Sequence, residues 1–533
     1  MNVLSLHSAG HDTGVGYFED GRLVYAVETE RLTRVKHDHR SDLALHHVLA
    51  RPEVDPARIE LVAVSTPVRG SLLRIPDLDR AMERIGAGAP HHRTVCELLG
   101  RRVACVVVTH EVSHGALAAH YAGHAEGTTV LVNEGRGQIT RSSLFQVRDG
   151  RLEWVEKDPL PWYGNGFGWT AIGHLFGHGL GPSVAGKVMA LGGYGSPDPR
   201  IRETLLAVDP RVMHDLELAR RVQEELSVRP EFARDFERMA SVVATHQELF
   251  TEAVHTVLDR HAVRTGSGVG PIALGGGCAL NIVANSVLRQ RFGRDIAVPP
   301  ACGDAGHLVG AGIYALKYLH GVDTAPFDVC ANGGGDSRAA ALEALADAGL
   351  TPLPYDGDAV ARTLADGGVV AHLEGRAELG PRALGHRSLL GNPAVPGMRK
   401  RMSEELKQRE WYRPLGAMMR AERFAELYPG EHPSPHMLFE YPLPEGTAPE
   451  ARHVNGTCRI QTLGPEEPRL HALLTAFEAL TGVPALINTS LNGPGRAIAH
   501  TARDVLDDFA RTGVDLYVFD EVMAYRAGAE RAR

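Results

Sequence analysis

One local pattern occurs twice in the first 160 residues and limits the folds open to the chain. An apolar segment at residues 2–8 precedes a polar turn, and the next segment alternates polar and apolar residues around an Asp-Gly pair at 20–21. The same order returns about 120 residues later, with an apolar segment at 128–133, a glycine-rich polar turn, and alternation around Asp-Gly at 149–150. An Asp-Gly pair between alternating segments is a strong signal for a β-hairpin. Strand, turn and hairpin therefore recur as one unit.

Two interpretations of this repeat are open. Hairpins are common, so the recurrence is either a coincidence or the mark of a duplicated α/β unit, as in the actin-like ATPase fold. Such a fold binds a nucleotide between its halves, with the turn after each first strand facing the phosphates. The second interpretation predicts an N-terminal duplicated actin-like domain.

A glycine-rich joint follows a mainly helical segment at 213–264. The sequence passes from an apolar strand to Gly275, Gly276 and Gly277, and then to a helix that carries Asn281. Glycines at such a joint let backbone N–H groups approach an anion or nucleotide at a helix N-terminus. Glycine-rich joints are also ordinary structural turns, so the motif alone decides nothing.

A linker-like segment divides the chain. Residues 331–338 are rich in glycine and polar residues. A helix follows, a new strand is predicted at 368–373, and strands and helices then alternate to near residue 526. We therefore predict one domain over residues 1–340 and a second α/β domain over residues 341–533. Two domains agree with 533 residues at roughly 100–200 residues per domain.

The charge balance excludes one class of partner. The formal net charge is -9, whereas a nucleic-acid-binding protein needs a basic face to neutralise phosphates. The N-terminal segment lacks the basic and apolar regions of a signal peptide, and no stretch approaches 18 consecutive apolar residues. We expect a cytoplasmic protein with no nucleic-acid or membrane partner, whose six cysteines are mostly buried free thiols. The sequence leaves the oligomeric state open, a homodimer included.

Two histidines at helical spacing mark a candidate metal site. His110 and His114 would share one helix face, directly after an apolar strand, where α/β proteins build their sites. Other pairs among the 27 histidines have the same spacing, so spacing alone does not select ligands. Asp304 lies in a small-residue turn that opens a helix. A carboxylate there either caps the helix or binds a metal.

Basic residues gather in loop-like sequence of the C-terminal part, among glycines and prolines. They are Arg376, Arg382, Arg387, Lys407, Arg409, Arg413 and Arg459. Arginines are usually solvated surface charges, but this irregular spacing does not place them on one helix face. In an acidic protein, a group of fixed cations suggests a phosphate or carboxylate site. Asn488, Ser490 and Asn492 are expected just beyond an apolar strand, as turn formers or as ligand contacts.

Ten segments, in one order along nearly the whole chain, resemble a single known family. They are GHD at 10–12, ETERLTRVKHD at 28–38, HEVSH at 110–114, AGKVMALGGYG at 185–195, GGGCALN at 275–281, CGDAG at 302–306, EGRAELGPRALGHRS at 374–388, KQREWYRP at 407–414, HVNGTCRIQT at 453–462 and GVPALINTSLN at 482–492. The family is that of the ATP-dependent O-carbamoyltransferases, which act on nodulation factors, aminoglycosides, cephems and ansamycins.

This resemblance implies a fold and a reaction. The implied fold is an N-terminal actin-like (ASKHA) domain, related to the tRNA threonylcarbamoyl-transferring subunit, and a C-terminal YrdC-like domain, similar to threonylcarbamoyl-adenylate synthase. In the family, the C-terminal domain cleaves carbamoyl phosphate and activates the carbamate with ATP. A hydroxyl of the acceptor then attacks carbamoyl adenylate at a metal in the N-terminal domain. The implied cofactors are ATP with Mg²⁺, carbamoyl phosphate as co-substrate, and iron (Fe²⁺) or a similar divalent metal. The implied acceptor is an antibiotic or another natural product.

The resemblance also assigns roles by position. His11 matches the family's proposed general base, and Lys36 is a further candidate that faces the substrate. His110, His114 and Asp304 match the metal ligands. The implied carbamoyl-phosphate contacts are Arg382, Lys407, Arg413, Arg459, Asn488 and Ser490. The predicted contacts to the nucleotide are Gly275, Gly276, Gly277 and Asn281.

One turn departs from the family pattern. Where the family has Asp-Gly-x-Gly-Glu and an aspartate ligand, this chain reads Glu-Gly-Arg-Gly-Gln from Glu134. Glu134 is one methylene longer and is the predicted fourth ligand, with Asn133 as the alternative. Two other functions stay open: an actin-fold small-molecule kinase, which would need no second basic domain, and a nucleotide-binding sensor that has lost activity, which the altered turn suggests.

Overall fold

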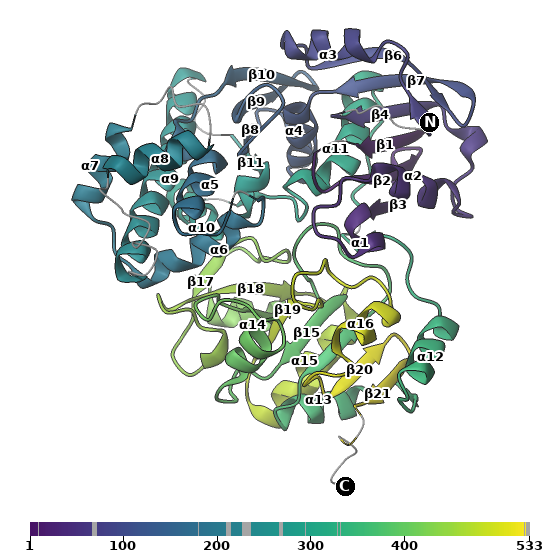
Figure 1. Ribbon diagram of the computed structural model, residues 1–533, viewed down its shortest axis with the longest axis vertical. Helices are drawn as coiled ribbons and strands as arrows, with labels where there is room; N and C mark the ends of the chain where they lie inside the picture. The colour runs from purple at the N-terminus through teal and green to yellow at the C-terminus, as the bar shows by residue number, and fades with distance from the viewer. Residues whose placement is uncertain are drawn as a thin grey trace. The chain divides into compact units, whose positions relative to one another are not determined.

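The chain forms two compact units, both built from helices and strands (Figure 1). The first contains Met1–Val24 and His39–Pro326, and the second contains Tyr25–Asp38 and Phe327–Arg533. The second unit thus begins ahead of the predicted boundary at 340 and includes a short N-terminal segment. The computed structural model describes residues 1–8, 10–66, 72–179, 181–208, 215–225, 236–265, 270–293, 295–327, 329–330, 332–526 and 528. Within these ranges, no helix combines the length and apolar character that a membrane span requires.

The first unit contains a seven-stranded and a five-stranded sheet, and five strands of the larger sheet have the same order as those of the smaller one. One has the order β3-β2-β1-β4-β7-β6-β5, and the other has the order β10-β9-β8-β11-β12. In both, the first strand in sequence runs antiparallel to its hairpin neighbour and parallel to the strand on its other side. The predicted duplicated α/β unit is therefore confirmed. The strands are β1 Asn2–His7, β2 Gly14–Glu19, β3 Arg22–Glu28, β4 Leu61–Ser65, β5 Leu73–Arg74, β6 His91–Leu98, β7 Arg101–Val108, β8 Thr129–Asn133, β9 Ser142–Arg148, β10 Arg151–Lys157, β11 Ile272–Gly275 and β12 Ile296–Ala297.

Both predicted hairpins are present, and their turns have the backbone that Asp-Gly favours. Asp20 and Gly21 have φ angles of 48° and 79°, and Asp149 and Gly150 have 48° and 68°. Two consecutive positive φ angles define the type I′ turn, whose twist matches that of the paired strands. The hairpins fix the register of each sheet half.

Helices connect and flank these sheets. α4 directly follows β7, and α11 directly follows the loop after β12, so the two helices occupy equivalent positions in the duplicated halves and pack against each other. The segment at 213–264 is helical where described, as predicted. The helices of the first unit are α2 Ser41–Leu49, α3 Leu78–Gly86, α4 His110–Tyr121, α5 Gly166–Leu175, α6 Val184–Val188, α7 Pro199–Ala207, α8 Asp215–Glu225, α9 Phe236–Thr265, α10 Ile282–Phe292 and α11 His307–Ile313.

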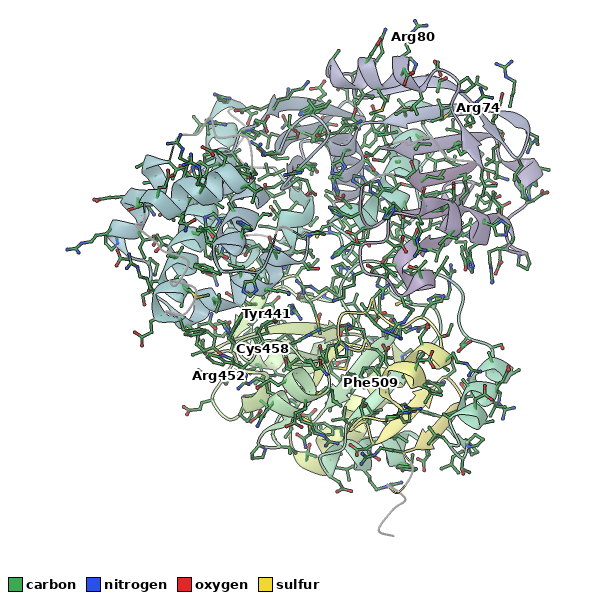
Figure 2. The ribbon with its side chains drawn as sticks, in the orientation of Figure 1. Arg74, Arg80, Tyr441, Arg452, Cys458 and Phe509 are labelled. Atoms are coloured by element: carbon green, nitrogen blue, oxygen red, sulfur yellow. The ribbon has the colours of Figure 1, made fainter. Side chains whose placement is uncertain are left out.

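The second unit is built on a nine-stranded mixed sheet with the order β13-β21-β20-β14-β15-β19-β16-β18-β17. Helices α13 and α15 pack together and bury apolar side chains against its strands. At one edge, Tyr441 lies opposite Cys458 in the β17–β18 pair (Figure 2). The strands are β13 Leu353–Pro354, β14 Val370–Leu373, β15 Arg387–Gly391, β16 Gly416–Arg420, β17 Glu440–Pro442, β18 Thr457–Leu463, β19 Ala485–Ser490, β20 Leu516–Phe519 and β21 Val522–Tyr525. The helices are α1 Thr29–Thr33, α12 Arg338–Asp347, α13 Gly357–Ala365, α14 Ala421–Leu427, α15 Pro468–Thr481 and α16 Ala502–Phe509.

The motif at 28–38 folds with the second unit because its side chains bind there. The buried Arg31 donates hydrogen bonds to the carbonyl oxygens of Glu378 and Gly380, at 3.3 and 2.6 Å. Arg34 forms an ion pair with Asp508. These contacts span more than 300 residues of sequence, so local patterns could not predict them. None of the six cysteines, all within the described ranges, is in a disulfide, and five are buried, as expected.

Candidate active site

Histidines and carboxylates gather at one edge of the two sheets in the first unit. β1 ends at His7, β7 leads into the helix that begins at His110, and β12 leads into the turn that contains Asp304. β8 is followed at once by Glu134. The carboxyl ends of parallel strands share one edge, which is where α/β proteins place their sites. The duplication thus brings equivalent loops from both halves to one place.

The Asp304 carboxylate stands at the centre of this cluster. Its Oδ1 atom lies 3.6 Å from His110 Nε2, 3.5 Å from His114 Nε2 and 3.8 Å from His307 Nε2. One donor atom from each of these four residues lies within 4.8 Å of every other. The Nε2 atoms of His110 and His307 are buried and have no hydrogen-bond partner among the described residues.

This donor set fits a divalent metal ion. A buried polar atom without a partner costs about 1–3 kcal/mol. The Nε2 atoms of His110 and His307 would each carry that cost unless a cation binds them. Imidazole together with carboxylate is a ligand set that suits iron and other first-row divalent ions better than magnesium. The predicted ligands His110, His114 and Asp304 are brought together, and His307 joins them.

The electrostatics of the cluster agree with this interpretation. Burial lowers the pKa of His110 to about 3 and that of His307 well below its usual value. Burial would also lower the pKa of His114, but Glu134 and Asp304 outweigh it and raise the pKa to about 9. His110 and His307 are therefore neutral, as metal ligands must be. At His114, a metal ion would have to displace a proton.

Glu134 reaches this cluster from the turn after β8. Its Oε1 atom lies 3.0 Å from His114 Nε2 and accepts a hydrogen bond from the Gly277 backbone N–H at 2.5 Å. Gly276 has a φ angle of 85°, and a Cβ atom on it would lie 2.3 Å from the Asn133 carbonyl oxygen. The glycine joint at 275–277 therefore packs directly against the turn that contains Glu134. The Asn133 side chain instead donates from Nδ2 to the Gly164 carbonyl oxygen at 2.9 Å.

The predicted nucleotide contacts have structural partners of their own. Asn281 caps α10, because its Oδ1 atom accepts from the Ala284 N–H at 3.1 Å, and its Nδ2 atom donates to Gln247 Oε1 at 3.0 Å. It therefore precedes the helix that was expected to carry it. Gly275 ends β11, with the His114 carbonyl oxygen 3.1 Å from where its Cβ atom would be.

His11 lies at the open side of the same cluster. Its side chain is 43% exposed, and its Nδ1 atom is 2.8 Å from Asp12 Oδ2 and 3.6 Å from Asp304 Oδ2. Partial burial lowers its pKa, but the two carboxylates outweigh this and raise it to about 9. The His7 ring nitrogen Nε2 lies 3.1 Å from the His11 carbonyl oxygen and so holds the backbone of this loop. An imidazole that faces both solvent and the buried carboxylate is well placed to exchange protons.

A second cluster, composed of cations, lies at the centre of the sheet in the second unit. Asn488 and Ser490 are inside β19 and not beyond it. Asn488 has ladder partners in the strands on both sides, and Ser490, the last residue of β19, pairs with Ser388. Asn488 lies opposite Leu390 in β15 and Gly416 in β16. This corrects the expected strand end, since the apolar sequence stops before the hydrogen-bonded strand does.

Lys407 is the best-anchored member of the cation cluster. Its Nζ atom donates to Ser490 Oγ at 3.2 Å, to Asn492 Oδ1 at 2.7 Å and to the Asn492 carbonyl oxygen at 3.1 Å. Burial lowers the pKa of Lys407 well below its usual value, and nearby Arg409, Lys36 and Arg413 lower it further. Lys36 therefore lies near this cluster, in the second unit. The oxygen atoms that accept these hydrogen bonds from the Lys407 ammonium group are all uncharged.

The arginines of the cluster repel one another. Burial, followed by Arg413 and Arg382, lowers the pKa of Arg409 to about 9. Burial and the same neighbouring cations lower the pKa of Arg459 well below its usual range, and its buried Nε atom has no hydrogen-bond partner among the described residues. Glu410 lies 3.5 Å from Arg413 and is the carboxylate that also acts on Arg409. A dianion such as phosphate is the ligand that would balance these charges.

Asn488 supplies a different group to this cluster. Its Nδ2 atom donates to the Ala383 carbonyl oxygen at 3.1 Å and to Gln461 Oε1 at 2.8 Å. Since both partners are acceptors, the amide orientation is fixed. Its Oδ1 atom is buried and has no hydrogen-bond partner among the described residues. The cluster thus combines several cations with one free acceptor.

Known proteins match both halves of the chain. Residues 97–313 match the model described as "Carbamoyltransferase N-terminus", and residues 361–526 match "Carbamoyltransferase C-terminus". The chain belongs to the carbamoyltransferase family. The resemblance found in the sequence is therefore confirmed.

The relatives of this carbamoyltransferase extend over its full length. It is 29% identical to nodulation protein NolNO of Sinorhizobium fredii, across 95% of this chain and 77% of the relative. It is also 29% identical to the 3'-hydroxymethylcephem-O-carbamoyltransferase of Amycolatopsis lactamdurans, across 97% of this chain and 98% of the relative. Among solved structures, the ADPNP-bound activator of 2-hydroxyisocaproyl-CoA dehydratase from Clostridium difficile is similar over 59% of this chain and 94% of its own, with 11% identity and a TM-score of 0.34.

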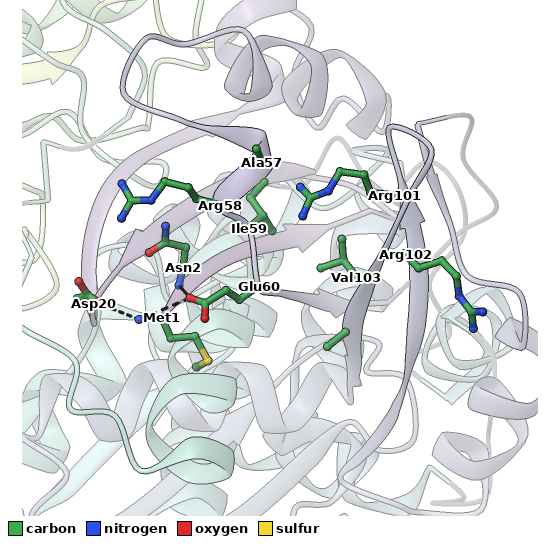
Figure 3. A pocket seen from close by; sticks show the side chains of 11 residues that line it. Met1, Asn2, Asp20, Ala57, Arg58, Ile59, Glu60, Arg101, Arg102 and Val103 are labelled. Carbon is green, nitrogen blue, oxygen red and sulfur yellow. Dashed lines mark hydrogen bonds and ion pairs between the residues drawn. The ribbon is translucent and has the colours of Figure 1, made fainter.

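A surface pocket in the first unit of the carbamoyltransferase lies away from the histidines. Figure 3 shows that it is lined by Met1, Asn2, Arg58, Glu60 and Arg101, among others. Asn2 and Arg101 are the first residues of β1 and β7. The pocket is therefore at the amino ends of these strands, opposite the edge at which the cluster lies. Its open, charged lining holds no group poised for catalysis.

Sequence reasoning missed His307 in the metal cluster. It placed Arg409 in the group of cations that suggests an anion site but not among the implied carbamoyl-phosphate contacts. His307 follows Asp304 by three residues at the start of α11, so the two share one helix face. That spacing was available in the sequence but is common. Arg409 binds Thr489 Oγ1 and Ser490 Oγ, each at 3.2 Å. Its position depends on how its segment folds against β19, which no local pattern reveals.

Proposed function

We propose that this carbamoyltransferase uses carbamoyl phosphate and ATP to transfer a carbamoyl group to a hydroxyl of a small natural product. Carbamoyl phosphate and water would give carbamate and phosphate, and carbamate with MgATP would give carbamoyl adenylate and pyrophosphate. The acceptor hydroxyl would then displace AMP. The named relatives support a natural-product acceptor, since one is a cephem carbamoyltransferase and another a nodulation protein.

The cation cluster of the second unit is the observation that carries this proposal. Carbamoyl phosphate has a dianionic phosphate at one end and an amide NH₂ at the other. Arg409, Arg459 and Lys407 offer charge to the phosphate, and charge-assisted hydrogen bonds of this kind are the strong ones. The Asn488 Oδ1 acceptor suits the NH₂ group, because it has no other partner among the described residues. A simple phosphate site would have no use for that acceptor.

The chemistry of this pocket follows from its charges. Carbamate is labile in water and a poor electrophile, so its activation requires an enclosed site. Fixed cations stabilise the negative charge that develops on the departing phosphate, which is a large electrostatic contribution to catalysis. A C-terminal domain similar to threonylcarbamoyl-adenylate synthase is consistent with this role and is part of the proposal. An actin-like N-terminal domain is the matching proposal for the duplicated unit.

The histidine cluster of the first unit would hold the metal. His110, His114 and Asp304 are the proposed ligands of iron or a similar divalent ion, with His307 and Glu134 beside them. Such an ion, when bound, supplies Lewis-acid polarisation of carbamoyl or phosphate oxygens. His11 is the proposed general base for the acceptor hydroxyl, because it alone among the five clustered histidines is substantially exposed. Asp12 orients its ring through Nδ1.

A product assay tests the proposal. Purified enzyme is incubated with MgATP, with and without carbamoyl phosphate, and with a panel of hydroxylated metabolites. We expect pyrophosphate and AMP to form only when carbamoyl phosphate is present. ADP formation with a phosphorylated metabolite would favour the kinase instead, and no nucleotide turnover under any condition would favour the sensor.

Two variants make the assay specific for the pocket. Arg409→Ala should raise the carbamoyl-phosphate concentration required for half-maximal pyrophosphate release by about 10–100-fold, as expected for a lost charged hydrogen bond. Arg503→Ala is the matched control, because Arg503 is an exposed arginine of the same unit that forms an ion pair with Asp347. Equal behaviour of the two variants would contradict the assignment of the pocket.

A further inference from the structure

A third cluster of ligand-type side chains lies in the second unit, apart from the cation pocket. Cys330, His386 and Glu467 each offer one donor atom, and these atoms lie within 4.8 Å of one another. Cys330 belongs to the segment that leads into the unit, His386 immediately precedes β15, and Glu467 immediately precedes α15. Three segments distant in sequence therefore meet at one point. The carbamoyl-phosphate chemistry proposed for this unit does not involve these three residues.

The hydrogen bonds of His386 fix how its ring is used. Nδ1 lies 2.9 Å from the Glu374 carbonyl oxygen, which can only accept, so Nδ1 carries a proton. Nε2 lies 3.1 and 3.3 Å from the two carboxylate oxygens of Glu467. A histidine whose Nδ1–H is held by a backbone carbonyl presents Nε2 as a metal ligand, which is the usual arrangement behind bound metals.

The charges around Nε2 require a cation. A bare Nε2 lone pair facing a carboxylate 3.1 Å away would be repelled, so either a second proton or a metal ion must lie there. A nucleophilic triad is a poor match, because its carboxylate would bind the ring nitrogen opposite the thiol, and here a backbone carbonyl occupies Nδ1.

We infer that Cys330, His386 and Glu467 form a zinc site. Thiolate, imidazole and carboxylate are the three ligand types of protein-bound Zn²⁺, and a thiolate favours zinc over magnesium or calcium. Cys330 is buried and the His386 side chain is 12% exposed, whereas Glu467 is 27% exposed. A fourth ligand, a water molecule, can therefore reach the ion from the side of Glu467. The ion would fasten the segment around Cys330 to β15 and α15.

Cobalt substitution tests this site separately from the histidine cluster. The full-length protein is stripped of metal with a chelator and titrated with Co²⁺ while its near-ultraviolet absorption is recorded. A thiolate ligand gives an intense charge-transfer band, and the cluster around Asp304 contains no cysteine among its four donors. We expect the band in wild-type protein and its loss in Cys330→Ser, with one equivalent of bound Co²⁺ lost as well.

Matched variants exclude general effects of the substitution. Cys96→Ala, at a buried cysteine of the first unit, should keep the band. Glu467→Gln keeps the size of the side chain and should weaken Zn²⁺ binding by about 10-fold or more, because an amide is a poor zinc ligand. Retention of the metal at the histidine cluster shows that each variant is folded. If wild-type protein shows no thiolate band with Co²⁺, the proposal is wrong, and this test needs no variant. The proposal is also wrong if the Cys330→Ser protein keeps the band.

Discussion

His114 Nε2 lies 3.0 Å from Glu134 Oε1, and the two residues come from different halves of the duplicated unit. His114 is on the helix after the last parallel strand of the first sheet, and Glu134 follows the first strand of the second sheet. Asp304 adds a second connection, since it comes from the second half and lies 3.5 Å from the same nitrogen. A metal ion bound here would therefore link the two halves and stabilise the unit by its binding free energy.

Replacing Glu134 should weaken the metal site without abolishing it. In Glu134→Ala, His110, His114 and Asp304 remain within reach of one another. We expect the affinity for Fe²⁺ to fall about 10–100-fold, the usual effect of losing a supporting group at a metal site. Competition with a chelator of known affinity measures the change. Glu126→Ala is the control, because Glu126 accepts a hydrogen bond only at the exposed hairpin of Asp149. Unchanged affinity would mean that Glu134 is a bystander.

His307 should behave as a metal ligand although the sequence did not point to it. We expect His307→Gln to lose about 10-fold or more in metal affinity, because its Nε2 atom lies 3.8 Å from Asp304 Oδ1 and has no other partner among the described residues. His246→Gln is a matched control. His246 is also a fully buried histidine of the first unit, but it packs beside Trp162 and Trp169, away from the cluster. Equal loss in both variants would indicate damage to the fold.

The comparison of sequence with structure separates local from long-range information. The hairpins at Asp20 and Asp149 were predictable because turn chemistry and alternation act over a few residues. The pair His110 and His114 was predictable for the same reason, since a strand followed by a helix fixes both side chains. That the motif at 28–38 folds with the second unit was not predictable, because it does so through contacts with residues more than 300 positions away.

The same distinction explains the cation pocket. Its arginines were recognisable as a group, because they lie among glycines and prolines and fit no helix face. Their mutual repulsion was not visible, since it depends on which segments lie side by side in the folded unit. Nor was the unpaired Oδ1 atom of Asn488, because its Nδ2 partners are Ala383 and Gln461, from two other segments. A residue's type suggests chemistry, but only the fold shows which of its atoms remain unused.

His11→Ala should separate activation of the carbamoyl group from its transfer. Product formation should fall about 10²–10⁴-fold, the usual contribution of a general base, while carbamoyl-phosphate-dependent pyrophosphate release should stay near the wild-type rate. The reason is that His11 belongs to the first unit and the cation pocket to the second. His39→Ala, at an exposed histidine, is the control. An equal loss of product formation and pyrophosphate release would show that His11 is not the general base.

The stability of the first unit should fall in acid, in part because of His246. Burial lowers the folded-state pKa of His246 to about 3, whereas an unfolded histidine has a pKa of about 6.5. The unfolded chain therefore binds a proton that the folded chain does not, so stability is lost as the pH falls below about 6.5. Between pH 7 and 5.5 this one group should cost about 1 kcal/mol. Urea unfolding of wild type and His246→Gln, both with chelator, should show the variant losing less stability by that amount. Identical losses would mean that His246 is protonated in the folded state.

Arg459→Met should make the ligand-free protein more stable and its use of carbamoyl phosphate less efficient. The side chain is held among other cations, its Nε atom is buried without a hydrogen-bond partner among the described residues, and burial and those neighbours lower its pKa. Replacing it with an apolar side chain of similar length should therefore raise the unfolding temperature of the ligand-free protein. The same change should raise the KM for carbamoyl phosphate about 10–150-fold, because a charged hydrogen bond of roughly 1.5–3 kcal/mol to the phosphate is lost. Arg452→Met is the control: Arg452 is an exposed neighbour in sequence, labelled in Figure 2, and should change neither quantity. Differential scanning calorimetry and the pyrophosphate assay give both readouts. A variant that is less stable than wild type would show that Arg459 supports the fold, and a variant with unchanged KM would show that the phosphate binds elsewhere.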